Sequence, residues 1–281
     1  MRNFLKAVIA KFIISLARLR NFYLIICPWG LGDTLFVGMC TGEIKKRKQK
    51  NIVIVCKKYT GAVCRDFETV DIVWAHNKLC NCFIYYAEAC GHKMNENYIY
   101  AHILDENISG FDNIVDRYSR GIFKLNGKIE YVYPKVHFPN RTTIDMGNSI
   151  ILAPYAKSKI CTVEGRFWED IAIACTRNGY EVYTNCGSKA EKEIRGTKRL
   201  QVSIDGIYYL AERAKAFISY RSGICDWLAL SEANMLVIND PMWGKEWNLN
   251  NFSRKEVKYF QYSRSAQEVI LREIINEIDA M

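Results

Sequence analysis

The chain has 281 residues, of which 49% are hydrophobic and 25% are charged. This balance supports one large domain or two of ordinary size, and it excludes a chain that is disordered throughout. The net charge of +9 suits an anionic small ligand, an anionic membrane surface or a nucleic acid. Because lysine and arginine are spread along the chain and no RNA- or DNA-binding signature is present, we expect no nucleic-acid partner.

The 11 cysteines do not follow the spacing of a disulfide framework. Several of them, such as Cys27, Cys56 and Cys175, lie inside apolar runs, where cysteine behaves as a small hydrophobic residue. We therefore expect reduced thiols and a cytoplasmic protein. Zinc-finger and zinc-ribbon spacing is also absent from the one cluster of metal-binding residue types, Cys80, Cys82, Cys90 and His92, and we expect no bound metal.

Residues 1–32 contain no Asp or Glu. In residues 1–20 the basic side chains lie mostly away from one apolar helical face, which comprises Leu5, Val8, Ile9, Phe12, Leu16 and Leu19. Lys11 interrupts this apolar run, so the run is too short to cross a bilayer, and no signal-peptide cleavage site follows it. Two interpretations stay open: a basic amphipathic helix on an anionic membrane surface, or a helix packed against its own domain.

Apolar runs alternate with helical patterns along the chain, which predicts parallel sheets covered by helices. In the first half we expect a helix over 34–46, ending in the basic run KKRKQK, whose charge suits a helix C-terminus. We predict strands at 22–27, 52–56 and 71–74, with weaker strand predictions at 113–116 and 130–133.

The pattern restarts after the polar segment 137–148, which reads HFPNRTTIDMGN and is typical of a linker. We therefore predict an N-terminal domain over 1–140 and a C-terminal domain over 148–281. Gly179 is expected to end a helix. The C-terminal domain is predicted to contain strands at 149–153, 181–184, 201–203, 216–219 and 235–239, and helices at 164–178, 207–213, from 223 onward, and 265–278.

Two glycine-bearing turns each connect a buried strand to a helix. The first contains Gly30, Gly32 and Asp33 in the sequence PWGLGDT, and the second, 221–226, reads RSGICD. Such a turn exposes backbone N–H groups at the positive end of a helix, where α/β proteins bind phosphate. Two such turns, each opening an α/β half, predict two nucleotide-binding domains that face one cleft.

Three segments of the second half form an ordered pattern: IILAPYAKSK, RFWEDIAIACTRNGYEVYTNCG and IDGIYYLAERAKAFISYRSGICDWLAL. They resemble the C-terminal domain of GT-B glycosyltransferases, most closely the ADP-heptose:lipopolysaccharide heptosyltransferase-like family, and the last is similar to that family's segment D-S-G-x-x-H-x-A. In the first half, GLGDTLFVGMCTGEIKKR is similar to the family's G-D-x-L opening. The resemblance implies an α/β fold of two Rossmann-like domains facing a cleft (GT-B), with a C-terminal helix.

Within that fold, the leaving diphosphate of a nucleotide-sugar donor must be stabilised and the acceptor hydroxyl must lose a proton. Arg221 replaces the family's Asp and is suited to clamp a phosphate in a bidentate manner. The resemblance assigns Asp33 as the base; its alternative is a helix N-cap. Gly30 and Gly32 allow close approach to a substrate. The predicted donor-binding residues are Lys157, Ser158, Lys159, Arg221, Ser222, Gly223 and Asp226, with Trp243 either stacking on a sugar or base or packing between domains.

We therefore expect a glycosyltransferase (hexosyl-, heptosyl- or fucosyltransferase) that moves a sugar from a nucleotide-diphosphate donor to a glycan or glycolipid acceptor hydroxyl. No cofactor is expected, and the absence of an Asp-x-Asp motif predicts metal independence; the inverting outcome follows from the resemblance alone. The expected location is cytoplasmic, at the inner face of a membrane. The alternatives are a non-catalytic nucleotide- or glycan-binding relative and a GDP-fucose-type fucosyltransferase. A dinucleotide-dependent oxidoreductase and a P-loop NTPase are disfavoured because their glycine motifs are incomplete or absent.

Overall fold

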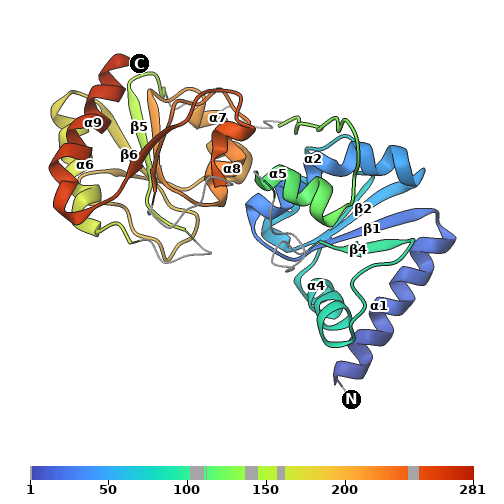
Figure 1. The fold of residues 1–281 in the computed structure, drawn as a ribbon. Coiled ribbons are helices and arrows are strands. Elements are labelled where there is room, and N and C mark those ends of the chain that lie inside the picture. The colour runs from blue at the N-terminus through green and yellow to red at the C-terminus, as the bar shows by residue number, and fades with distance from the viewer. Residues whose placement is uncertain (1, 102–110, 112, 137–144, 157–161, 240–246) are drawn as a thin grey trace. The chain divides into compact units, whose positions relative to one another are not determined.

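A computed structural model describes residues 2–101, 111, 113–136, 145–156, 162–239 and 247–281. The chain divides into two compact units, Met1–Val136 and His137–Met281 (Figure 1). Each unit contains one sheet in which all neighbouring strands are parallel. The predicted α/β class with two Rossmann-like units and a C-terminal helix is confirmed.

The sheet of the first unit has the strand order β3-β2-β1-β4. Its strands are β1 (Phe22–Cys27), β2 (Asn51–Cys56), β3 (Ile72–Ala75) and β4 (Tyr98–Tyr100). Strands β1 and β2 pair in register along their whole length, from Phe22 opposite Asn51 to Cys27 opposite Cys56. Because parallel strands are covered on both faces, they appear in the sequence as continuous apolar runs.

Helices cover both faces of this first sheet (Figure 1). Helix α1 (Arg2–Leu19), helix α4 (Asn77–Ile84) and the π-helix η2 (Tyr85–Ala89) share a hydrophobic core with one face. Helix α2 (Leu31–Lys48) lies on the other face, near α5 (Ile114–Asp116) and the π-helix η4 (Arg117–Ile122). The remaining short elements are η1 (Lys58–Thr60) and α3 (Gly61–Arg65).

The second unit has the strand order β10-β9-β8-β5-β6-β7. Its strands are β5 (Ser149–Ala153), β6 (Glu181–Asn185), β7 (Lys198–Leu200), β8 (Ala216–Tyr220), β9 (Met235–Asn239) and β10 (Lys258–Gln261). Helices α6 (Gly165–Arg177) and α9 (Gln267–Ala280) pack together on one face, and α7 (Ile204–Ala211) and α8 (Gly223–Leu228) lie on the other (Figure 1). Short 3-10 turns η6 (Leu249–Asn251) and η7 (Arg264–Ala266) flank β10.

Three strand predictions are wrong. Segment 113–116 is helical because the Asn113 side chain accepts a hydrogen bond from the Asp116 N–H and caps the helix start. Segment 130–133 is not a strand. The strand expected at 201–203 is instead β7, three residues earlier, because Ser203 caps α7 by accepting from the Gly206 N–H. Gly179 does end α6 in the left-handed conformation, with φ of +84°.

Candidate functional site

Each sheet has one point at which the strand order reverses. In the first unit this point is beside β1, which lies between β2 and β4, and in the second it lies between β5 and β8. Ligands of open parallel sheets bind outside the carboxyl ends of the strands at such a point. The turn with Gly30 and Asp33 follows β1, and the turn from Arg221 to Asp226 follows β8. Each predicted turn therefore occupies the switch point of its own sheet.

The carboxylate of Asp33 is fixed by the start of helix α2. Gly30 is the N-cap residue, and its backbone N–H donates to Asp33 Oδ2 over 2.9 Å. Asp33 therefore occupies the third helical position, rather than the N-cap position considered from the sequence. Its carboxylate accepts from the backbone N–H of the N-cap residue, as in a capping box. The Thr34 hydroxyl also donates to the Gly30 carbonyl over 2.9 Å, and Gly32 is buried beside it.

The second oxygen of Asp33 is held by a residue far away in the sequence. The Tyr118 hydroxyl donates to Asp33 Oδ1 over 2.5 Å, and Tyr118 is fully buried. Tyr118 lies in the π-helix η4, and π-helical turns are rare and frequent at functional sites. The Tyr118 ring also packs on Phe36 of α2. The two hydrogen bonds hold the Asp33 carboxylate in place. A carboxylate has lone pairs left after accepting two hydrogen bonds, so Asp33 can accept a further one.

Two further groups respond to the charge of Asp33. Burial, and after it the Asp33 charge, raises the pKa of the Tyr59 hydroxyl, which donates to the Trp29 carbonyl over 3.2 Å. The same two causes, in the same order, raise the pKa of the Cys27 thiol well above its usual range. Both shifts favour the neutral, protonated forms of Tyr59 and Cys27.

Arg221 and Asp226 form a buried ion pair in the second turn. Arg221 Nη2 lies 2.6 Å from Asp226 Oδ1, and the side chains are 2% and 7% exposed. The guanidinium also donates to the carbonyls of Ser222, over 2.9 Å, and Trp247, over 3.3 Å. Burial lowers the pKa of Arg221, but Asp226 and its other neighbours outweigh that effect and raise it. The structure brings these two predicted donor-binding residues together, and they form an ion pair with each other.

Ser222 presents an unsatisfied hydroxyl at this turn. It is the N-cap residue of α8, yet its side chain makes no capping hydrogen bond. Its Oγ atom is buried and has no hydrogen-bond partner among the described residues, and Asn239 Oδ1, at the end of the neighbouring strand β9, is in the same state. A buried polar group without a partner costs about 1–3 kcal/mol. Helix α8 begins at the next residue, Gly223, so the unsatisfied hydroxyl lies at the start of this helix.

The other predicted donor-binding residues lie outside the described residues: these are Lys157, Ser158, Lys159 and Trp243. The strand that precedes the loop with Lys157 and Lys159 is nevertheless described. Strand β5 pairs with β8, with Ala153 opposite Ser219. The loop that begins after β5 therefore leaves the sheet next to the Ser222 turn.

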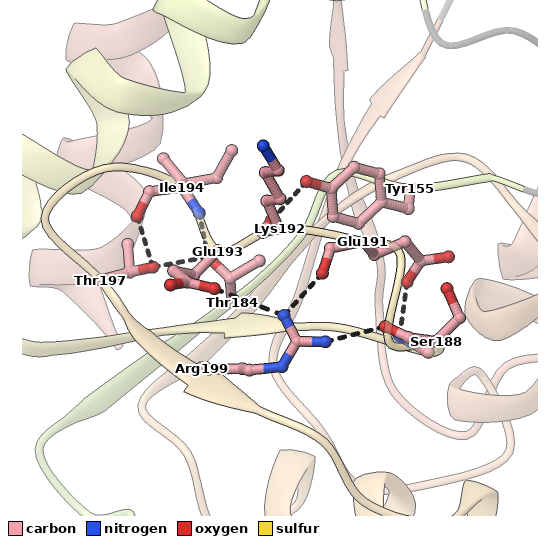
Figure 2. A network of polar contacts seen from close by, with 10 residues as sticks. Tyr155, Thr184, Ser188, Glu191, Lys192, Glu193, Ile194, Thr197 and Arg199 are labelled. Carbon is pink, nitrogen blue, oxygen red and sulfur yellow. Dashed lines mark hydrogen bonds and ion pairs between the residues drawn. The ribbon is translucent and has the colours of Figure 1, made fainter.

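A network of hydrogen bonds that the sequence did not indicate orders the loop between β6 and β7 (Figure 2). Arg199 of β7 donates to the Glu191 carbonyl over 2.6 Å and to the Ser188 carbonyl over 2.8 Å. The Tyr155 hydroxyl, which follows β5, donates to the Lys192 carbonyl. This network holds the loop between β6 and β7 against Arg199 of β7 and against Tyr155, which follows β5.

The cysteine and histidine cluster does not form a metal centre. In the described part of the chain, no group of three or more His, Cys, Asp or Glu side chains could hold a metal ion. Cys80 and Cys82 are buried in helix α4. His92 stacks on the ring of Tyr86, with 4.7 Å between ring centroids.

No protein-family model and no curated protein matches this sequence. Solved structures do match its fold. ADP-heptose LPS heptosyltransferase II of E. coli has 13% identity and a TM-score of 0.67, covering 92% of this chain and 97% of that one. The E. coli heptosyltransferase WaaC with ADP has 13% identity and a TM-score of 0.61, covering 91% and 99%. A glycosyl transferase family 9 structure from Veillonella parvula has 8% identity and a TM-score of 0.60, covering 93% and 98%. The expected GT-B fold is confirmed.

Removing one member of the buried ion pair is expected to destabilise the second unit. Asp226→Asn removes a counter-charge from the buried Arg221 guanidinium, and we expect a loss of about 3–5 kcal/mol in the free energy of unfolding. The matched control is Glu68→Gln, which breaks the exposed pair with Lys135 and is expected to cost less than about 1 kcal/mol. Urea denaturation measures both variants, and equal stabilities would contradict the structural role of the pair.

Proposed function

We propose that this protein is a glycosyltransferase that moves a sugar from a nucleotide-diphosphate donor to a hydroxyl of a glycan or glycolipid. One observation carries the proposal: the two predicted turns lie at the switch points of their sheets, one with an anchored carboxylate and one with an unsatisfied buried hydroxyl. The fold that the chain shares with heptosyltransferases supports it. The proposed location is cytoplasmic, at the inner face of a membrane.

The donor diphosphate is assigned to the switch point of the second unit. The Ser222 hydroxyl and the N–H groups that begin α8 at Gly223 are suited to donate to phosphate oxygens. Lys157 and Lys159, with Ser158, follow the adjacent strand β5 and would add positive charge and a hydroxyl. Solved relatives include complexes with ADP and with ADP-2-deoxy-2-fluoro heptose, and we propose a donor of that chemical class.

The contacts of Arg221 change the role that we propose for it. The Arg221 guanidinium already donates to Asp226 and to two backbone carbonyls, so we propose that it holds the turn in shape. Asp226 then acts on the donor site indirectly, by orienting Arg221. Trp243 is proposed to stack on the sugar or base.

The reaction we propose is a single displacement. The acceptor hydroxyl oxygen forms a bond to the anomeric carbon of the sugar while the bond from that carbon to the diphosphate oxygen breaks. The acceptor proton passes to Asp33, and the electron pair leaves with the nucleoside diphosphate. Charge that develops on the diphosphate is stabilised by the Ser222 turn and the lysines, without a resident metal ion. Attack opposite the leaving group inverts the anomeric centre.

The Asp33→Asn variant tests the base. Asparagine can still accept from the Gly30 N–H and leaves helix α2 closed, so we expect a folded protein that binds nucleoside diphosphates normally. Turnover of the donor, measured as hydrolysis of ADP-, GDP- or UDP-sugars in the absence of acceptor, should fall about 10²–10⁴-fold. Asp279→Asn, on the exposed end of α9, serves as the control. Undiminished turnover in the Asp33 variant would remove Asp33 from the mechanism, and absence of hydrolysis in the unmodified protein would favour a non-catalytic binder.

Tyr118 is proposed to be a positioning residue for Asp33. Tyr118→Phe removes the donor to Asp33 Oδ1, and we expect kcat to fall about tenfold with an unchanged KM for the donor. Tyr131→Phe is the matched control, since the Tyr131 hydroxyl contacts Ser119 and Asp116 in the same region. Equal kcat values for the two variants, or a donor KM that rises in the Tyr118 variant while kcat stays constant, would contradict the positioning role.

Ser222→Ala tests the donor site independently of catalysis. Loss of one hydrogen bond to a charged phosphate should weaken nucleoside diphosphate binding about 10–100-fold. The thermal shift produced by whichever of ADP, GDP or UDP stabilises the protein should then shrink. Ser265→Ala, an exposed serine of the same unit, is expected to keep the full shift. An unchanged shift in the Ser222 variant would place the phosphates elsewhere.

A further inference from the structure

Helix α1 has two apolar faces that point in opposite directions. Its inner face carries Ala10, Ile14 and Ala17, which are buried in the core formed with α4, η2 and the first sheet. Figure 1 shows α1 alongside α4 on this side of the sheet. The packing interpretation of the N-terminal segment is therefore correct, but it concerns side chains other than those of the predicted apolar face.

The outer face of α1 is apolar and exposed. Its residues recur at intervals of three and four, which places them along one side of the helix. Their exposed fractions range from 41% at Leu16 to 81% at Leu19. At 1.5 Å per residue this stripe is about 21 Å long. The outer face comprises Leu5, Val8, Phe12, Leu16 and Leu19, with Phe4 at its N-terminal end.

Positive charge borders this outer face. Lys11 and Arg18 are two helical turns apart and lie along one edge of the stripe, and Arg20 follows the helix; all three are exposed. Arg18 pairs with Glu96 of a neighbouring segment, whose carboxylate lies 3.8 Å from its guanidinium. No acidic residue is present in the helix itself, or anywhere in residues 1–32.

We propose that the outer face of α1 docks the protein on an anionic lipid surface. An exposed stripe of Phe, Leu and Val with basic residues at its edge is the pattern of a helix that lies in the membrane interface. The lipid headgroups supply the negative charge that the helix lacks, and the acyl boundary takes up the apolar side chains. In the described part of the chain no helix is both long and apolar enough to cross a membrane.

A lipid surface fits this face better than a second copy of the chain does. Two copies meeting through α1 would bring like charges together at Lys11 and Arg18, which is unfavourable across an interface. The inference deepens the proposed function by giving the membrane location a specific surface. It is tested without donor or acceptor, so that its failure is distinguishable from failure of the glycosyltransferase proposal.

The test is flotation of the full chain with lipid vesicles. We expect the protein to bind vesicles that contain phosphatidylglycerol, to bind pure phosphatidylcholine vesicles at least about tenfold more weakly, and to be released as salt increases. The double variant Phe12→Ser/Leu16→Ser should lower the partition coefficient at least about tenfold. Lys11→Glu, which leaves the apolar stripe intact, should weaken binding several-fold.

The matched controls change the same chemistry elsewhere. Ile173→Ser/Val269→Ser alters two exposed apolar residues of the second unit, with exposed fractions of 45% and 55%, and Lys189→Glu alters an exposed lysine there. Both controls are expected to bind vesicles as the unmodified protein does. Circular dichroism melting verifies that every variant is folded.

Three outcomes would overturn the proposal. One is no binding of the unmodified protein to phosphatidylglycerol vesicles. Another is equal loss of binding in the α1 variants and in their controls. The third is concentration-dependent dimerisation, seen by light scattering and abolished by Phe12→Ser/Leu16→Ser in the absence of vesicle binding, which would assign the face to a second copy.

Discussion

The placement of every candidate group depends on the pairing of parallel strands. In each sheet, later strands are added on both sides of the first strand, which is β1 in one unit and β5 in the other. The loops that follow the strands therefore diverge at one point of the carboxyl edge. In the first unit α2 begins after β1, the first strand of its sheet, and in the second unit α8 begins after β8, which lies across the switch point from the first strand β5. Backbone hydrogen bonds between the strands fix these points, and both turns border the switch point of their own sheet.

The two turns manage their charge in opposite ways. Asp33 accepts from a backbone N–H and from the buried Tyr118 hydroxyl, and both donors are neutral. Its negative charge therefore remains available to a substrate. The charge of Arg221 is compensated within the protein by Asp226, so neutral donors at Ser222 and Gly223 are left to meet a ligand. A base that accepts a proton and a site that stabilises a departing diphosphate need this kind of difference.

Structural features that depend on a local sequence pattern could be predicted from the sequence alone. Strands β1, β5 and β9 begin and end where the apolar runs indicated, because parallel strands are buried on both faces. Strand β10 and the three-residue strand β4 were not foreseen. They contain mixed residues, and their conformation is set by the neighbouring strands with which they pair.

The candidate site was predictable only in part, for the same reason. The glycine turns were recognised from their strand and helix neighbours, whereas the contact between Tyr118 and Asp33 joins residues 85 positions apart through a π-helix. The partnership of Arg221 with Asp226 was also missed, since a sequence shows two charges but not which of them is buried. Helix α1 was described by one apolar face, and its smaller Ala10, Ile14 and Ala17 face was overlooked because those side chains give a weak pattern.

The central claim is that the turn from Arg221 to Asp226, at the switch point of the second sheet, binds the diphosphate of a nucleotide-sugar. A crystal structure of the chain with a non-hydrolysable nucleotide-sugar, chosen from the diphosphates that stabilise it, tests this most directly. The account predicts diphosphate oxygens within hydrogen-bond distance of Ser222 Oγ and of the backbone N–H groups that begin α8. A diphosphate bound away from the carboxyl end of β8 would contradict it.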